Sequence, residues 1–252
     1  MVLIDFTEVD LVYPVRDNRG LTLKDLVLGG IFQRPSVRRW KSVHALRGVT
    51  FRIDDGERVG IIGRNGASKS TLLRTIGGVY PVQGGRRRVE GSIGSLFDLT
   101  LGFEPAATGR DNIRYRGYLQ GETPRTIETK IRQVAEFAAL GDAIDLPLNC
   151  YSSGMIMRLG FAIAASAEPE ILLVDEVFAA GDLVFRAKAE ARMRQLRDRA
   201  RIVVMVGHNL DMLQEFCTRI LWLREGRVCA DGPPEAVVAQ YREEAAIEAL
   251  AA

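Results

Sequence analysis

A glycine-rich loop between an apolar strand and a helix constrains the fold more than any other feature of this chain. The stretch Val59 to Ile62 is continuously apolar, as in a buried strand, and Thr71 to Ile76 has helical character. The loop between them reads "GRNGASKST" over residues 63–71. In this arrangement, backbone N–H groups and a helix N-terminus can surround a phosphate. The order predicts an α/β fold with a phosphate site at the end of this strand.

The loop matches the pattern G-x-x-x-x-G-K-[ST] of nucleotide-phosphate loops at every fixed position except one. Gly63, Lys69 and Ser70 are in register, whereas Ser68 stands where the second glycine belongs. In such loops the lysine reaches the β- and γ-phosphates, and the hydroxyl after it ligates Mg2+. We therefore predict ATP and Mg2+ as cofactors and the following phosphate-site residues: Gly63, Asn65, Gly66, Ala67, Ser68, Lys69, Ser70 and Thr71.

Ser68 is the weak point of this interpretation. Phosphate loops alternate right-handed and left-handed residues, and a non-glycine residue held left-handed costs about 1–2 kcal/mol. We expect Ser68 to weaken nucleotide binding or to slow turnover, unless the loop relaxes. A chance glycine-rich turn between a strand and a helix is the alternative, so the other motifs must decide.

The remaining patterns predict a mainly parallel sheet with helices on its faces. Two buried-type strands, Ile171 to Val174 and Ile202 to Val206, are separated by the charged helical stretch Leu183 to Arg199. The turn Asp55-Gly56 predicts a hairpin between Val49–Ile53 and Val59–Ile62. We also expect a mostly helical insertion over Arg110–Leu140, a closing hairpin of Ile220–Arg224 with Arg227–Ala230, and a terminal helix over Pro234–Ala251.

Composition excludes several classes of protein. The chain has 252 residues, 47% of them apolar, which is enough for one large domain with its own core. The formal net charge of +2 gives no field that would favour nucleic acid as a partner. Three widely spaced cysteines fit a reducing compartment better than a disulfide or zinc framework. No apolar run approaches the roughly 20 residues of a membrane helix, and the acidic N-terminus is unlike a secretion signal.

Two carboxylates follow the predicted strand at Ile171. The segment "ILLVDEVFAAGD" places Asp175 and Glu176 at the carboxyl end of that strand, where ligands of open α/β sheets bind. Asp175 is then expected to hold Mg2+ through its water shell, and Glu176 to orient and deprotonate the attacking water. The alternative is a strand that simply ends in a polar turn.

A second anion site is expected at "YSSGM". Met155 to Ala167 predicts a buried helix that begins at Ser152, Ser153 and Gly154. Its first free N–H groups and its dipole favour an anion. As an alternative, two serines and a glycine are simply a good start for a helix.

Together these motifs resemble the nucleotide-binding subunit of ABC transporters. The loop at 63–71, "YSSGM", Asp175-Glu176, Gly181-Asp182 and His208 occur in the family's order. "TGRDNI", "EFAALGDAID" and "YSSGMIMRL" are similar to the subgroup that exports polysaccharides such as O-antigen and teichoic acid. The resemblance runs from Leu3 to about Tyr241.

The resemblance implies a head-to-tail homodimer and further site residues. ATP would lie between the phosphate loop of one copy and the signature loop, Ser152 to Gly154, of the other. His208 would contact the γ-phosphate, although Gly207 and Asn209 replace the usual serine and aspartate around it. The nucleotide site would also include Asp182, Asp98 in place of the usual glutamine and beside Mg2+, and an aromatic residue under the adenine, for which Tyr13 and Trp40 both remain candidates.

An insertion at about residues 16–42 is longer than a minimal ABC ATPase requires. Its leucines show helical spacing, and the basic, Trp-containing segment Arg34 to Lys41 follows. Such a piece either rests at lipid headgroups or packs on the domain. In the polysaccharide-export group, an insertion here resembles a helix near the entry for a lipid-linked glycan.

We therefore expect one ABC-type P-loop domain over residues 1–252, with a mainly parallel core sheet, an antiparallel β part, a helical subdomain at about 101–168 and no C-terminal sugar-binding domain. The expected function is ATP hydrolysis that powers glycan export through two copies of a separate membrane permease, on the cytoplasmic face of the inner membrane. The alternatives are an ABC subunit with impaired turnover that regulates by binding nucleotide, and an exporter ATPase for another substrate.

Overall fold

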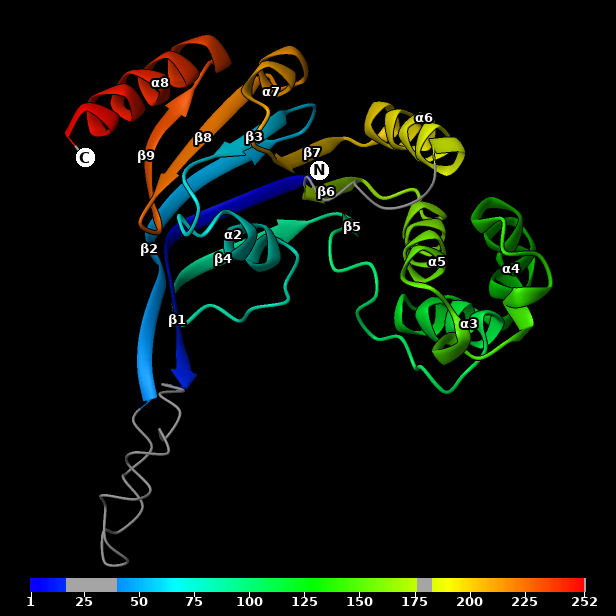
Figure 1. Cartoon of the computed structure of the whole chain (residues 1–252). Helices are drawn as coiled ribbons and strands as arrows, with labels where there is room; N and C mark the ends of the chain where they lie inside the picture. The colour runs from blue at the N-terminus through cyan, green and yellow to red at the C-terminus, as the bar shows by residue number, and fades with distance from the viewer. Residues whose placement is uncertain (17–39, 176–182, 252) are drawn as a thin grey trace, which may run out of the picture.

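Two sheets of different kinds make up the β part of the protein (Figure 1). The computed structural model describes residues 1–16, 40–175 and 183–251, with the backbone alone at 15, 16, 40, 41, 183 and 248–251. The larger sheet has the order β5-β6-β7-β3-β8-β9, in which all neighbours are parallel except β8 and β9. Its strands are β3 (Arg58–Ile62), β5 (Ile93–Leu96), β6 (Ile171–Asp175), β7 (Ile202–Val206), β8 (Arg219–Arg224) and β9 (Arg227–Gly232).

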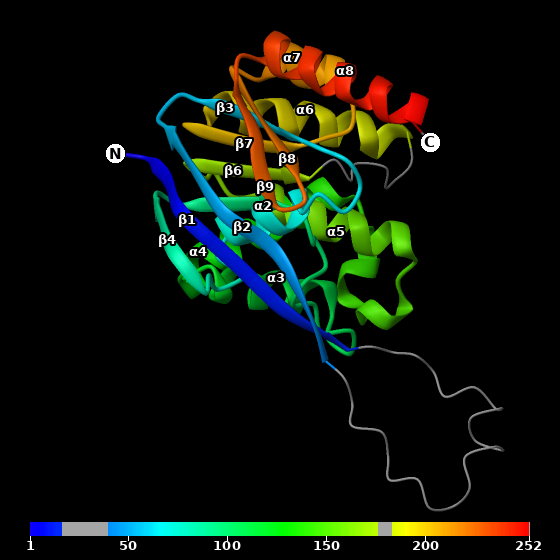
Figure 2. The same cartoon turned by 90° about the vertical axis from the view of Figure 1, so that its left-hand side faces the viewer.

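The smaller sheet is antiparallel and has the order β2-β1-β4. It consists of β1 (Leu3–Arg16), β2 (Trp40–Asp54) and β4 (Gly84–Glu90). The long β1–β2 ribbon, seen lengthwise in Figure 2, extends to a pair formed by Arg16 and Trp40. The expected insertion therefore begins and ends at the tip of this ribbon, and its residues 17–39 lie outside the described residues.

The predicted hairpin between Val49–Ile53 and Val59–Ile62 is wrong. A turn does form at Asp55-Gly56, but it is tied to the start of β7, because the Gly56 N–H donates to the Arg201 carbonyl at 2.8 Å and the Arg201 guanidinium binds Asp55. β2 pairs with β1 instead, and β3 is inserted between β7 and β8. The alternating pattern of β2 suits an antiparallel sheet, while the continuously apolar β3 suits a parallel strand that is buried on both faces.

The helices are divided among separate cores. α2 (Lys69–Ile76) packs in one core with apolar side chains of both sheets. α3 (Gly109–Leu119), α4 (Pro124–Ala138) and α5 (Ser153–Ala165) stand to one side in Figure 1 and enclose a core of their own. The remaining helices are α6 (Leu183–Arg199), α7 (Leu210–Phe216) and α8 (Pro234–Ala251), together with short 3-10 turns at Gly141–Asp145 and Leu148–Cys150.

Most of the expected elements are confirmed. Thr123 caps α4 ahead of Pro124, which occupies the first turn as expected for a helix start. The helix after Asp175, the closing β8–β9 hairpin and the terminal helix are present at or near their predicted bounds. The parallel core sheet, the antiparallel part and the helical part confirm the predicted fold class. Over the described ranges, no helix is both long and apolar enough to cross a bilayer.

Candidate nucleotide site

Strand register brings the predicted phosphate, metal and γ-phosphate residues to one edge of the six-stranded sheet. Ile61 of β3 and Asp175 of β6 are both Cα partners of Val206 in β7, so they lie level with each other. Asp98 follows the end of β5, which is paired with β6, and His208 follows the end of β7. Because these strands are parallel, the phosphate loop, Asp98, Asp175 and His208 all leave the same carboxyl-terminal edge. This is the edge at which open α/β sheets bind ligands.

The phosphate loop has the left-handed backbone expected of a phosphate nest. Gly63 has φ of 148°, and a Cβ there would lie 2.2 Å from the Leu223 carbonyl oxygen, so only glycine fits. Ser68 has φ of 76° and ψ of 24°, which confirms that this serine is held left-handed. The loop has therefore not relaxed to relieve the serine. The loop carries the backbone strain of a left-handed serine.

The first turn of α2 is open for an anion. Ser68 is the N-cap of this helix, but its side chain caps none of the helix N–H groups. Lys69 is 7% exposed, and its ammonium donates to the carbonyls of Gly63 at 2.7 Å and Arg64 at 3.1 Å. A phosphate in the nest would offer the lysine stronger, charged acceptors than these carbonyls. The hydroxyl of Ser70 and the carboxylate of Asp175 provide the hard oxygen donors that Mg2+ prefers.

Asp98 has a partner that sequence reasoning missed. Both of its carboxylate oxygens accept hydrogen bonds at 2.8 Å from the Arg74 guanidinium, one turn beyond Ser70 on α2. This bond raises the pKa of Arg74. To bind a water molecule of Mg2+, the Asp98 carboxylate would therefore have to give up a hydrogen bond to Arg74. A basic residue at the solvent side of α2 gave no signal of this role in the sequence.

His208 precedes the residue that caps α7. His208 is exposed at the end of β7, and Asn209 accepts a hydrogen bond from the Met212 N–H at 3.1 Å. Asn209 thus replaces the family's usual aspartate as the N-cap of α7. The predicted catalytic Glu176 and the predicted Asp182 lie outside the described residues.

The "YSSGM" segment begins α5, away from the phosphate loop. Figure 1 shows α5 within the helical group and α2 between the sheets. The Ser152 hydroxyl caps α5 by accepting from the Met155 N–H at 3.2 Å, so the expectation of a good helix start is confirmed. Tyr151 is buried and donates to the Ala143 carbonyl, which anchors the loop that leads into the helix, and burial raises its pKa. In this first turn Ser153 is exposed and Gly154 is half-buried.

The two adenine candidates lie on opposite strands of the same ribbon. The ring of half-buried Tyr13 stacks on Tyr80, with 6.2 Å between the ring centroids. Gln83 fixes this end of β1, because its side chain binds both the N–H and the carbonyl of Val12. Trp40 is in β2, but its side chain lies outside the described residues. Sequence reasoning missed both Tyr80 and Gln83, which only the pairing of β4 with β1 brings to this place.

Comparisons with known proteins identify the family. The profile of the ABC transporter family matches residues 46–179. An O-antigen export system ATP-binding protein of Klebsiella pneumoniae is 35% identical over 243 residues, which cover 96% of this chain and 98% of that protein. A teichoic acids export ATP-binding protein of Lactococcus lactis is 38% identical over 203 residues, 81% of this chain and 43% of its own length.

Solved structures agree in fold. An ATP-binding cassette solved as a dimer with ADP and phosphate superposes with a TM-score of 0.66 and 20% identity, over 92% of this chain and 98% of its own. The predicted resemblance and fold are confirmed. The chain belongs to the ABC transporter family, as an ATPase subunit of that family.

Proposed function

We propose that this subunit powers the export of a polysaccharide or lipid-linked glycan, as two copies bound to two copies of a separate membrane permease on the cytoplasmic face of the inner membrane. The observation that carries the ATPase part is the meeting of the phosphate loop, Asp98, Asp175 and His208 at one sheet edge. The export of a glycan is supported by the near full-length similarity to O-antigen export proteins.

The second copy completes the site in this proposal. Each phosphate loop has basic and hydroxyl groups on its own chain, but the free N–H groups at Ser153 and Gly154 begin a helix of the separate helical group. In a head-to-tail pair, the first turn of α5 from one copy would face the γ-phosphate held by the other. The α5 dipole and N–H groups would then stabilise charge that neither chain reaches alone.

Mg2+, when bound, would neutralise charge on the β- and γ-phosphates. Ser70 and Asp175 would hold it, directly and through water, and Asp98 is the further candidate. Lys69 would bind the β- and γ-phosphates, and His208 would contact the γ-phosphate in the same chain. Glu176 would orient the attacking water and accept its proton. Either Tyr13 or Trp40 would stack on the adenine.

The permease is expected to dock on an exposed apolar patch of the helical group. Leu101, Tyr118 and Leu119 are 57%, 52% and 75% exposed. Leu101 lies close to the end of α3, because Arg116 binds the Leu101 carbonyl at 2.6 Å and Leu119 lies beside Gly102. Tyr118 precedes Leu119 in α3. A patch of large apolar side chains at the surface favours a protein partner. Leu101 is three residues after Asp98, so one loop would contact both the permease and the nucleotide site.

One observation favours a second candidate, a subunit that binds nucleotide but turns it over slowly. The Arg74 guanidinium occupies both carboxylate oxygens of Asp98, the residue predicted to stand beside Mg2+ in place of the usual glutamine. Phosphate release by the purified complex separates the two candidates. The exporter proposal requires ATPase activity that Glu176→Gln abolishes while ATP binding remains. A rate unchanged by Glu176→Gln would contradict it.

A further inference from the structure

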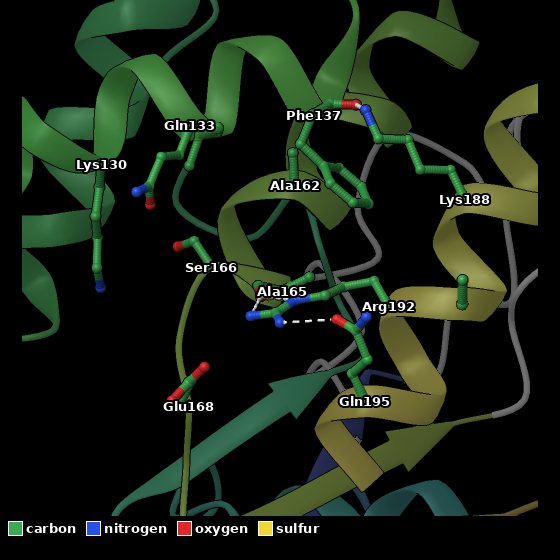
Figure 3. Close-up of a pocket in the computed structure, with 12 residues that line it drawn as sticks. Lys130, Gln133, Phe137, Ala162, Ala165, Ser166, Glu168, Lys188, Arg192 and Gln195 are labelled. Atoms are coloured by element: carbon green, nitrogen blue, oxygen red, sulfur yellow. Dashed lines mark hydrogen bonds between the residues drawn. The ribbon is translucent and has the colours of Figure 1, made fainter. Parts of the chain in front are cut away.

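A cavity lies where the helical group meets α6. Its volume is about 760 Å3, and α4, α5 and α6 line it (Figure 3). Apolar walls come from Val134, Phe137 and Ala162, and three cations, Lys130, Lys188 and Arg192, stand around it. Its lining therefore has the composition of a site for an anion.

The cations of this cavity are already used within the chain. Lys130 binds Glu122 at 2.5 Å, and the one lining carboxylate, Glu168, is paired with Arg199. Lys188 and Arg192 both bind backbone carbonyls, as Figure 3 shows for each. An anionic ligand would have to break these bonds. The arrangement instead fits a joint between packed elements.

The two cations that α6 contributes to this cavity each close the C-terminal end of another helix. The Lys188 ammonium donates to the carbonyls of Glu136 and Phe137, at 3.3 and 3.1 Å, in the last turn of α4. The Arg192 guanidinium donates twice to the Ala165 carbonyl, at 3.0 and 2.8 Å, at the end of α5. A cation at a helix C-terminus satisfies otherwise unpaired carbonyls and complements the helix dipole.

An aromatic cluster joins the same three helices. The rings of Phe137, Phe161 and Phe185, one from each helix, have centroid separations of 5.8 to 6.0 Å. Lys188 also lies 4.5 Å from the centroid of the Phe137 ring. α4 and α5 are thus fixed to α6 near their C-terminal ends, through apolar packing on one side and cationic caps on the other.

The geometry of α5 turns a small change at this joint into a large one at the signature loop. The helix has 13 residues from Ser153 to Ala165, and its C-terminal end is the end that Arg192 holds. At a rise of 1.5 Å per residue, a tilt of ~10° about this end moves the other end by ~3 Å. A misplacement of ~1 Å can cost as much as ~100-fold in the rate of a positioned reaction.

We propose that Lys188 and Arg192 are positioning residues for ATP hydrolysis. They hold the C-terminal ends of α4 and α5 to α6, and so aim the first turn of α5 at the nucleotide of the second copy. This inference rests on the proposed two-copy site. Neither residue touches ATP, so their loss should weaken closure of the pair without changing how one copy binds nucleotide.

The test measures ATP-driven dimer formation of the full chain in a Glu176→Gln background, which prevents turnover. Lys188→Met and Arg192→Met keep the aliphatic stems and remove the charges. Each should raise the concentration of Mg-ATP at half-maximal dimer formation by about two- to tenfold. Lys188→Arg keeps the positive charge and should have the same midpoint as the parent. Arg194→Met, at an exposed arginine of the same helix, is the matched control and should not change it.

Two further measurements separate positioning from general loosening. With dimer closure blocked by Gly154→Asp, the ATP affinity of single copies should match the parent for both Met variants, and loss of a helix cap should lower the melting temperature by only about 2–4 °C. The inference would be overturned if Lys188→Met and Arg192→Met had the same dimerisation midpoint as Arg194→Met. It would also be overturned if their ATP affinity as single copies fell as much as their dimerisation did. If the Glu176→Gln parent itself forms no dimer with Mg-ATP, the proposed two-copy function fails first, and this inference fails with it.

Discussion

Replacing Ser68 by glycine should stabilise the nucleotide-free protein. Ser68 has φ of 76°, so its strain lowers the free energy of unfolding. Release of this strain is worth about 1–2 kcal/mol, and the greater freedom of glycine in the unfolded chain returns about 0.4–1 kcal/mol. We expect a net gain of about 1 kcal/mol, or about 2–4 °C in melting temperature for a domain of this size.

The same reasoning limits the effect on ATP affinity. If the loop is left-handed both with and without nucleotide, strain cancels between the two states and Ser68→Gly leaves the dissociation constant nearly unchanged. The earlier expectation that Ser68 weakens binding then applies only to contact between its side chain and the phosphates. If Ser68→Gly binds ATP more tightly or hydrolyses it faster, the difference gives the cost of contact between the Ser68 side chain and the phosphates.

Urea unfolding without nucleotide, with calorimetric ATP titration beside it, provides the assay. Ser68→Ala keeps the Cβ and the strain, and because the hydroxyl caps no N–H of α2, its stability should match wild type. Gly66→Ala is the reverse control, since Gly66 has φ of 83° and open space around its Cβ position, and it should lose about 1 kcal/mol. A Ser68→Gly protein no more stable than wild type, beside a destabilised Gly66→Ala, would refute the strain argument.

Two other predictions concern thiols and the adenine platform. Burial raises the pKa of Cys217 to about 12, so a thiol reagent at neutral pH should modify it only after unfolding, whereas exposed Cys150 and Cys229 should react in the native protein. Modification of Cys217 in the folded protein would contradict its burial. Tyr13→Ala should weaken ATP binding by about two- to tenfold if Tyr13 stacks on adenine, with Tyr13→Phe close to wild type. The same loss in Trp40→Ala alone, measured by ATP titration, would assign the role to Trp40.

Local patterns were enough to predict most elements, because caps, turns and apolar periods act over a few residues. The phosphate loop, Pro124 at the start of α4 and the apolar strands at Ile171 and Ile202 all formed as their patterns indicate. The hairpin prediction failed because pairing is decided at long range. The turn at Asp55 was right, but the strand after it pairs with β7 and β8, which lie far along the chain.

Contacts in the site between residues of different elements could likewise not be predicted from the sequence. Asp98 was found by its place in a motif, yet its partner Arg74 is 24 residues away, and no local period links them. Tyr80 meets Tyr13 only because β4 returns to pair with β1. The caps at Lys188 and Arg192 join three helices whose packing no single segment specifies.

Mixing two inactive variants tests most directly whether each ATP is held by two copies. Lys69→Ala should disable the phosphate loop and leave the first turn of α5 intact. Gly154→Asp should place a carboxylate against the partner's γ-phosphate and still fold, since the nearest atom to a Cβ at Gly154 is 3.9 Å away. Each variant alone should release little phosphate from ATP. A pair containing one of each retains one complete site, so the mixture should recover part of the wild-type rate. No recovery, in mixtures shown to form such pairs, would contradict a site shared between copies.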